Sequence, residues 1–249
     1  MTITDPAAAP EAALLEASAA AWDEPEGLFA RGTLVVLGGR GETPAVYERF
    51  GTRISRDAYR VRALGDAAAD TAAVRRAAVA LLADADLPSP KVLVGSDAGA
   101  ALALELAASG DAPVDALVLA GLPTSDASAE DISARTACPT HQGVLGREST
   151  DAGRDATLPA ELLGVTASAV AVPVLALHGD ADAVSPIGAA VEVLGLAPRA
   201  EVHAVAGGRH DILNDVSHRS VAATVVLFLE RVKASTDATP IVTRIGADA

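Results

Sequence analysis

Three loops of this sequence carry residues that together could perform nucleophilic catalysis. Asp97 follows an apolar run, a second loop holds Asp180 and Asp182, and a third holds His210 after two glycines. A nucleophile needs a base within hydrogen-bond reach, and the base needs a carboxylate that orients it. Asp97, an acid of the second loop and His210 are therefore candidates for nucleophile, orienting acid and base if the three loops meet.

The glycines around Asp97 indicate which residue of the first loop occupies the turn. A residue on a sharp strand-to-helix turn is strained and requires small residues two positions before and two after it. Gly95 and Gly99 meet this requirement for Asp97, whereas Ser96 lacks glycines at the same offsets. Asp also tolerates a positive φ better than most residues. The plainer alternatives are that Asp97 only caps the following helix and that Ser96 is a small turn residue.

Alternating strand and helix patterns position these loops. Short β-branched runs alternate with segments of helical apolar spacing, which indicates an α/β fold, a mostly parallel sheet with helices on both faces. The expected strands are residues 33–39, 59–64, 91–95, 114–121, 172–179 and 200–207, and the expected helices are 43–58, 70–85, 98–109, 185–197 and 216–234. Thr43 and Asp70 are the expected N-caps of the first two helices. In such folds the site lies at the carboxyl ends of the strands, where all three loops fall.

Residues 122–168 interrupt this alternation. The segment is polar, contains prolines and glycines, and has only short helical patterns, which is typical of an insertion. The expected organisation is an N-terminal extension (1–29), a core in two parts (30–121 and 169–234), an insertion (122–168) and a C-terminal tail (235–249).

Three motifs resemble the α/β-hydrolase superfamily, and most closely its monoacylglycerol-lipase and lysophospholipase-like branch. They are "LGGRGETPAVYERFGTRISRDAYRV" (37–61), "VLALHGDADAVSP" (174–186) and "AGGRHDILND" (206–215), and the resemblance spans about residues 30–234. It implies that Asp182 is the acid and His210 the base, and that the N–H groups of Arg40 and Ala98 form the oxyanion hole. It also implies that the insertion is a cap over the pocket.

The chain departs from this family at two positions. Asp97 stands where the family has its serine nucleophile, and Gly38 stands where it has a histidine in the oxyanion loop. A carboxylate nucleophile favours displacement at an alkyl carbon, as in haloalkane dehalogenases and epoxide hydrolases of the same fold. However, the position after Asp97 is Ala98 rather than a halide-binding Trp, and the insertion contains no Tyr to protonate an epoxide oxygen.

Three functions follow from these motifs. The first is a hydrolase of an unknown small substrate that forms a covalent intermediate on Asp97. The second is an esterase or lipid hydrolase that uses Ser96 or an Asp-activated water. The third is a non-catalytic relative that binds a ligand or partner, which would account for both departures.

Four other residues have plainer interpretations. His178 is expected to be a buried structural histidine beside the acid loop, and Arg40 a solvated loop residue of which only the N–H matters. Cys138 and His141 could line the pocket, but this pair alone has too few ligands for a zinc site.

Composition excludes several classes of function. The net charge of −14 disfavours nucleic acid and anionic membrane surfaces as partners. No apolar run reaches the ~20 residues of a membrane span, and the first twenty residues contain no Lys or Arg, so we expect a cytoplasmic protein without stable membrane anchoring. A single cysteine excludes a disulfide framework. We expect a small-molecule substrate, no cofactor and no metal, and the sequence does not determine the oligomeric state.

Overall fold

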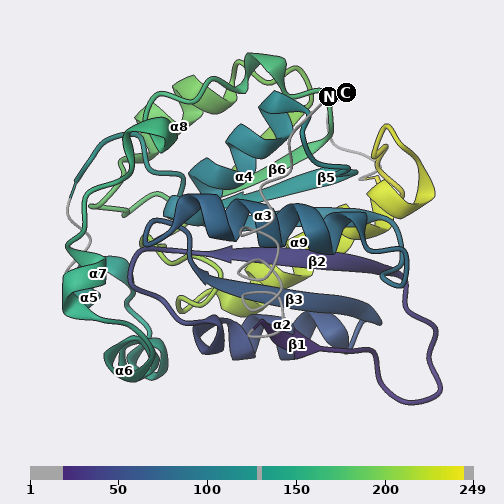
Figure 1. Cartoon of the computed structure of the whole chain (residues 1–249), viewed down its shortest axis with the longest axis horizontal. Helices are drawn as coiled ribbons and strands as arrows, with labels where there is room; N and C mark the ends of the chain where they lie inside the picture. The colour runs from purple at the N-terminus through teal and green to yellow at the C-terminus, as the bar shows by residue number, and fades with distance from the viewer. Residues whose placement is uncertain (1–18, 128–130, 244–249) are drawn as a thin grey trace.

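Seven strands form one sheet in the order β1-β3-β2-β4-β5-β6-β7 (Figure 1). The structure, a computed structural model, describes residues 19–127 and 131–243. The strands are β1 (Ala20–Trp22), β2 (Gly32–Gly38), β3 (Tyr59–Asp66), β4 (Lys91–Ser96), β5 (Ala116–Ala120), β6 (Val174–Gly179) and β7 (Ala200–Val205). All neighbours pair in parallel except β1, which is antiparallel to β3. The expected α/β class and mostly parallel sheet are confirmed.

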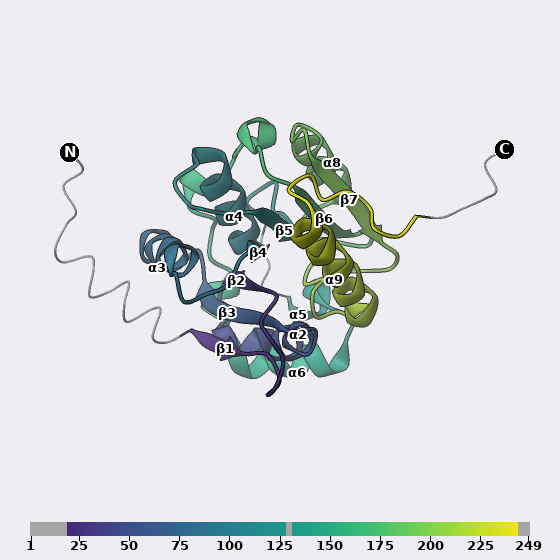
Figure 2. The same cartoon turned by 90° about the vertical axis from the view of Figure 1, so that its right-hand side faces the viewer.

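Helices cover both faces of the sheet, as Figure 2 shows end-on. The helices α3 (Thr71–Ala83), α4 (Ala98–Ser109) and α8 (Ile187–Leu194) contribute to one apolar core cluster. The helices α2 (Glu48–Ser55) and α9 (His218–Ala234) contribute to the other. Because β2, β4, β5 and β6 are buried along their whole length, they are nearly continuous apolar runs.

The starts of two helices test the N-caps predicted from the sequence. Asp70 caps α3, its side chain accepting from the Ala73 N–H as expected. The expected helix 43–58 instead begins as a 3-10 turn, η1 (Pro44–Tyr47), before α2. Thr43 precedes this turn but makes no side-chain cap bond, because its hydroxyl donates to Glu148.

The strand β1 was not expected, since it lies within the assigned N-terminal extension. Three residues are too few for a periodic signal, so only pairing with β3 reveals the strand. Trp22 lies against α2, where a Cβ on Gly51 would come within 2.3 Å of its ring. Residues 1–18 of the extension and residues 244–249 of the tail lie outside the described residues.

The segment between β5 and β6 carries short helices at the carboxyl end of the sheet (Figure 1). They are α5 (Ile132–Arg135), α6 (Pro139–Glu148), α7 (Asp151–Arg154), η2 (Ala160–Leu162) and η3 (Ala167–Ala169). Residues 128–130 of this segment lie outside the described part.

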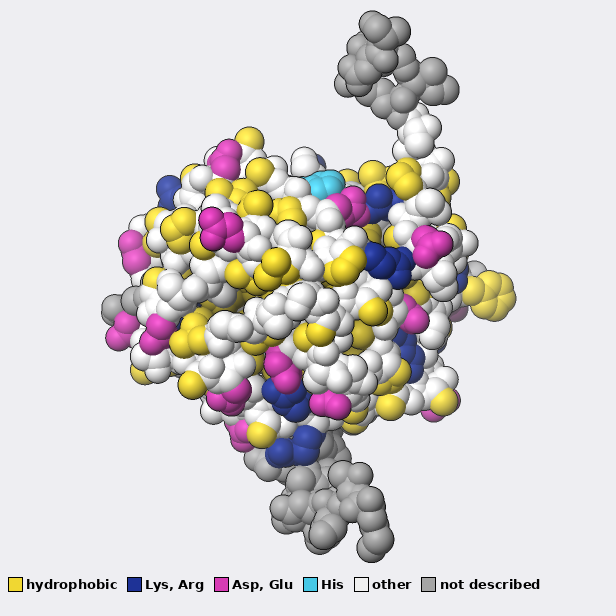
Figure 3. All heavy atoms as spheres, turned by 90° about the horizontal axis from the view of Figure 1, so that it is seen from above, with side chains coloured by type: hydrophobic (Ala, Val, Ile, Leu, Met, Phe, Trp, Pro, Cys, Tyr) yellow, Lys and Arg dark blue, Asp and Glu magenta, His cyan; other side chains and the backbone are white. Residues whose placement is uncertain are grey.

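Acidic side chains are spread over the face of the molecule that Figure 3 shows. They lie among apolar and neutral groups, and several of them lie beside Lys or Arg. In the part of the chain that the structure describes, no helix is both long enough and apolar enough to span a bilayer.

Candidate active site

Asp97 occupies a strained turn between β4 and α4. Its φ is 49° and its ψ is −123°, a conformation that few non-glycine residues adopt. A Cβ on Gly95 would lie 2.2 Å from the Gly99 carbonyl oxygen, and a Cβ on Gly99 would lie 2.1 Å from the Leu37 carbonyl oxygen. The two glycines are therefore required for this turn, as the spacing predicts. Asp97 precedes α4 but makes no side-chain cap bond, so the helix-cap interpretation is wrong.

His210 and Asp182 complete a line of three buried side chains. The His210 Nδ1 lies 2.8 Å from Asp182 Oδ2, and its Nε2 lies 3.2 Å from Asp97 Oδ1. The Asp182 Oδ1 accepts the N–H groups of Val184 and Ser185, which fixes the carboxylate. The three loops identified in the sequence therefore meet at one place. The Nε2 contact is misaligned for a hydrogen bond, and this nitrogen has no hydrogen-bond partner among the described residues.

His178 supports the acid rather than the reaction. It is 1% exposed, its Nε2 lies 2.6 Å from the Ser185 carbonyl oxygen and 3.1 Å from Asp182 Oδ2. This agrees with the expected structural role. Asp180 caps a different turn, its Oδ1 accepting the Gly207 N–H at the surface.

The burial and the contacts of the Arg40 side chain differ most from what the sequence predicts. It is 0% exposed, so the interpretation as a solvated loop residue is wrong. Its backbone N–H and its Nε donate to Asp97 Oδ2 at 2.9 and 3.0 Å, and its Nη2 donates to Oδ1 at 3.0 Å. Its Nη1 donates to the carbonyl oxygens of Ala127 and Ala156 in the segment between β5 and β6. The guanidinium therefore ties the turn to that segment.

These contacts set the charge of the site. Burial opposes ionisation of Asp97, but His210 and Arg40 outweigh it and hold the pKa of this carboxyl well below its usual range. Burial also opposes protonation of His210, but Asp182 and Asp97 outweigh it and raise the pKa of His210 to about 10. The resting site at neutral pH is therefore an ionised Asp97 between two cations.

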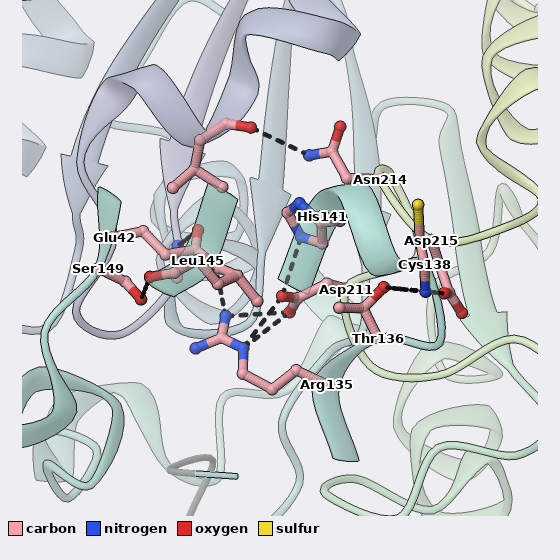
Figure 4. Close-up of polar contacts among 12 residues, drawn as sticks. Glu42, Arg135, Thr136, Cys138, His141, Leu145, Ser149, Asp211, Asn214 and Asp215 are labelled. Atoms are coloured by element: carbon pink, nitrogen blue, oxygen red, sulfur yellow. Dashed lines mark hydrogen bonds and ion pairs between the residues drawn. The ribbon is translucent and has the colours of Figure 1, made fainter. Parts of the chain in front are cut away.

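A second buried network adjoins the first (Figure 4). Arg135, which is 0% exposed, ion-pairs with Glu42 and with Asp211, and its Nη1 donates to the Arg40 carbonyl oxygen. His141 Nε2 lies 3.2 Å from Asp211 Oδ2. These groups hold the loop that contains Arg40 and Glu42, and the residue after His210, against α5 and α6.

Three predicted positions have other roles or no contact that tests them. Ala98 is the first residue of α4 and is fully buried. Its expected role as an oxyanion donor stays a prediction. Ser96 is buried and lies beside the Tyr47 hydroxyl, whereas His210 faces Asp97. Cys138 lies 3.5 Å from Arg49 Nη1, away from the triad. In residues 19–127 and 131–243, no group of three or more His, Cys, Asp or Glu has the arrangement of a metal site.

Comparison with solved structures identifies the fold of this chain. A monoacylglycerol lipase from Paleococcus ferrophilus is 14% identical, with a TM-score of 0.67 over 87% of this chain and 98% of that one. A soluble variant of monoglyceride lipase from Saccharomyces cerevisiae, solved with a substrate analogue, is also 14% identical, with a TM-score of 0.67 over 86% and 91%. The chain has the α/β-hydrolase fold. MenH from S. aureus gives 15% identity and a TM-score of 0.66 over 87% and 99%.

Sequence comparison adds nothing to this assignment. No protein-family model matches the chain, and no curated sequence matches it significantly. The α/β-hydrolase fold of this chain is therefore shown by its architecture.

Two buried arginines of this α/β-hydrolase fold carried little signal in the sequence. Arg40 stood in a recognisable turn, but nothing local indicated that its side chain would fold inward to Asp97. Arg135 lies in the polar insertion, 76 residues before its partner Asp211. A charged residue in a polar segment is normally solvated, so only the folded chain identifies it.

Proposed function

We propose that the protein is a hydrolase that forms a covalent ester on Asp97, with His210 as base and Asp182 orienting it. One observation carries the proposal: the two oxygens of Asp97 face different partners. Oδ2 accepts the Arg40 backbone N–H expected of the oxyanion hole, whereas Oδ1, which also accepts Arg40 Nη2, faces Nε2 of His210 at 3.2 Å. This arrangement supports a mechanism in which one oxygen stays beside the oxyanion donor and the other attacks the substrate.

In the first step, Oδ1 attacks a saturated carbon of the substrate. A carbon–oxygen bond forms, the bond to the leaving group breaks, and the leaving group departs with the electron pair as an anion. Arg40 Nη2 then loses its carboxylate partner on Oδ1 and is free to donate to that anion. The Arg40 side chain thereby supplies a hydrogen-bond donor to the leaving group. The sequence offered no candidate for this donor, because it lacks the Trp after the nucleophile and a Tyr in the insertion.

In the second step, water attacks the ester carbon of Asp97 and His210 takes its proton. Esterification removes the charge of Asp97, which is one of the two that raise the pKa of His210. The pKa of His210 must then fall, so the imidazolium passes its proton to the departing anion or to water and can then act as a base. The oxyanion forms on Oδ2, beside the Arg40 N–H. Collapse releases the alcohol and restores the carboxylate.

Substrate entry requires the segment 122–168 to move, and we propose that it acts as a cap. Arg40, Asp97 and His210 are each 0% exposed. The carbonyls of Ala127 and Ala156 hold the Arg40 guanidinium in place. Separation of the segment from the core releases these bonds and opens a path to Oδ1. The division into extension, core, cap and tail, the small substrate and the cytoplasmic location stay predictions.

The test is detection of the ester by intact mass. Halogenated carboxylic acids, epoxides and short acyl esters are incubated with His210→Gln, which cannot activate water. We expect one of them to leave a mass adduct on a peptide that contains Asp97, and Asp97→Asn to leave none. In water labelled with ¹⁸O, a single turnover should place the label in Asp97 and not in the alcohol. Full activity of Asp97→Asn on the same substrate would exclude this mechanism.

A second candidate, a non-catalytic binding protein, is favoured by the tight closure of the site. Arg40 contacts both oxygens of Asp97, and a carboxylate held in this way is a weaker nucleophile. In that case none of the substrates is consumed and none leaves an adduct, while a ligand still raises the melting temperature. The esterase alternative predicts turnover of acyl esters that Ser96→Ala abolishes.

A further inference from the structure

A groove rich in basic side chains lies outside the candidate active site. It has a volume of about 580 Å³ and runs between α2, α6 and the start of α9. Its basic lining residues are Arg49, Arg53, Arg56, His141, His218 and Arg219. Glu48 is the single acidic residue of the lining, although the whole chain has 33 acidic residues and 19 Lys and Arg.

Three of the arginines have no side-chain partner among the described residues. Arg53, Arg56 and Arg219 are exposed, and none of their side chains makes an ion pair or a hydrogen bond there. Arg49 is partly buried and donates to the Asn214 carbonyl oxygen at 3.1 Å. The groove therefore holds cations that the protein itself does not neutralise.

This charge distribution costs stability in the absence of an anion. Arg49 and Arg53 are four residues apart on α2, a spacing at which like charges destabilise a helix. Arg219 lies in the first turn of α9, where the helix dipole disfavours a cation. Ser217, the N-cap residue of α9, makes no side-chain cap bond, and the first turn contains no acidic residue. A bound anion would relieve all three conditions.

The pKa of His218 is shifted by the same positive charges. Burial, followed by the charges of Arg49, Arg219 and His141, lowers the pKa of His218. His218 is therefore surrounded by positive potential rather than paired with a carboxylate.

The floor of the groove holds an unsatisfied polar group. Asn214 is 2% exposed and lines the groove, and its Oδ1 has no hydrogen-bond partner among the described residues. Its Nδ2 makes a long contact of 3.4 Å to the Val46 carbonyl oxygen. Figure 4 shows Asn214 and His141 above the Arg135 network. A buried amide oxygen without a donor costs free energy, and because this oxygen is itself enclosed, a rotation of the Asn214 side chain toward the groove would let a ligand hydroxyl satisfy it.

From these observations we propose that the groove binds a small soluble phosphate ester that also carries hydroxyl groups. The phosphate would lie among Arg53, Arg56 and Arg219, where guanidinium groups can donate in pairs to its oxygens. A hydroxyl would donate to the Asn214 Oδ1. A headgroup on an anionic membrane has the same chemistry, but the net charge of −14 opposes that surface.

The experiment is calorimetric titration of the full chain at low ionic strength, where charge attraction is least screened. The probes are fructose 1,6-bisphosphate, inorganic phosphate and fructose. We expect the bisphosphate to bind more tightly than inorganic phosphate and fructose not to bind. Arg53→Gln and Arg219→Gln should each weaken bisphosphate binding about tenfold. Asn214→Ala should weaken binding of the bisphosphate but not of inorganic phosphate.

The matched control is Arg147→Gln. Arg147 is an exposed arginine of α6 that does not line the groove. An equal loss of affinity in this control would show attraction by overall charge and would overturn the site. Absence of binding by both phosphate probes would overturn it as well. Sedimentation with phosphoinositide vesicles in place of soluble binding would refute the soluble ligand. The measurement is independent of activity, so the site can fail while the hydrolase proposal stands.

Discussion

The Arg40–Asp97 ion pair gives the sharpest test of the structure. Both side chains are wholly enclosed, at 1% and 0% exposure, and Arg40 makes three bonds to the carboxylate. Replacement of Arg40 by Met keeps an unbranched apolar stem and removes the guanidinium and its charge. Because one partner of a buried pair is then left uncompensated, we expect the free energy of unfolding to fall by about 3–5 kcal/mol.

Two features place the expected loss toward the lower end of this range. His210 stays 3.2 Å from Asp97 Oδ1 and still compensates part of its charge. The backbone N–H of Arg40 also remains as a donor to Oδ2. The double variant Arg40→Met/Asp97→Asn should recover part of the loss, since neither member then leaves a bare charge.

The assay is urea denaturation followed by circular dichroism, with Arg31→Met as the matched control. Arg31 pairs with Glu230, and these side chains are 40% and 32% exposed, so this pair should contribute about 1 kcal/mol or less. An Arg40→Met loss no larger than that of Arg31→Met would refute the reasoning, because it would mean that Arg40 is solvated and does not close the site.

Three further outcomes follow from the same structure. The folded-state pKa of His210 is about 10, above the unfolded value of 6.5, so its stabilisation should be complete below about pH 6.5 and disappear as the pH rises through 10; denaturation midpoints of His210→Gln should lack this decline. Gly99→Ala should prevent folding or destabilise the protein strongly, because the added Cβ would lie 2.1 Å from the Leu37 carbonyl oxygen. Gly188→Ala, where the added Cβ meets open space, should stabilise α8 by about 0.5–1 kcal/mol. The melting temperature of each variant measures both effects. Ser96→Ala should leave any hydrolytic activity within about twofold, since Ser96 lies beside the Tyr47 hydroxyl and the Nε2 of His210 faces Asp97.

Local sequence patterns were sufficient to predict the framework. Alternating apolar runs and helical spacings gave six of the strands and the main helices, because buried parallel strands and amphipathic helices need these periods. Short elements escaped this reasoning. The strand β1 has three residues, and the helix expected at 43–58 starts as a 3-10 turn, with the Thr43 hydroxyl bonded to a distant Glu148 instead of capping it.

The sequence by itself determined the position of Asp97. Gly95 and Gly99 permit one residue between them to take the strained turn, and the strand-end loops with Asp182 and His210 must meet at the same edge of a parallel sheet. These are consequences of backbone sterics and strand direction, which a sequence encodes locally.

Only the tertiary structure decided the environment of that carboxylate. Arg40 reaches Asp97 across 57 residues, and Arg135 reaches Asp211 across 76. A charged side chain enters the interior only where several distant groups can satisfy it together, and no local pattern records that set. The same holds for Arg53, Arg56 and Arg219, which have no side-chain partner among the described residues and line one groove only after the chain has folded.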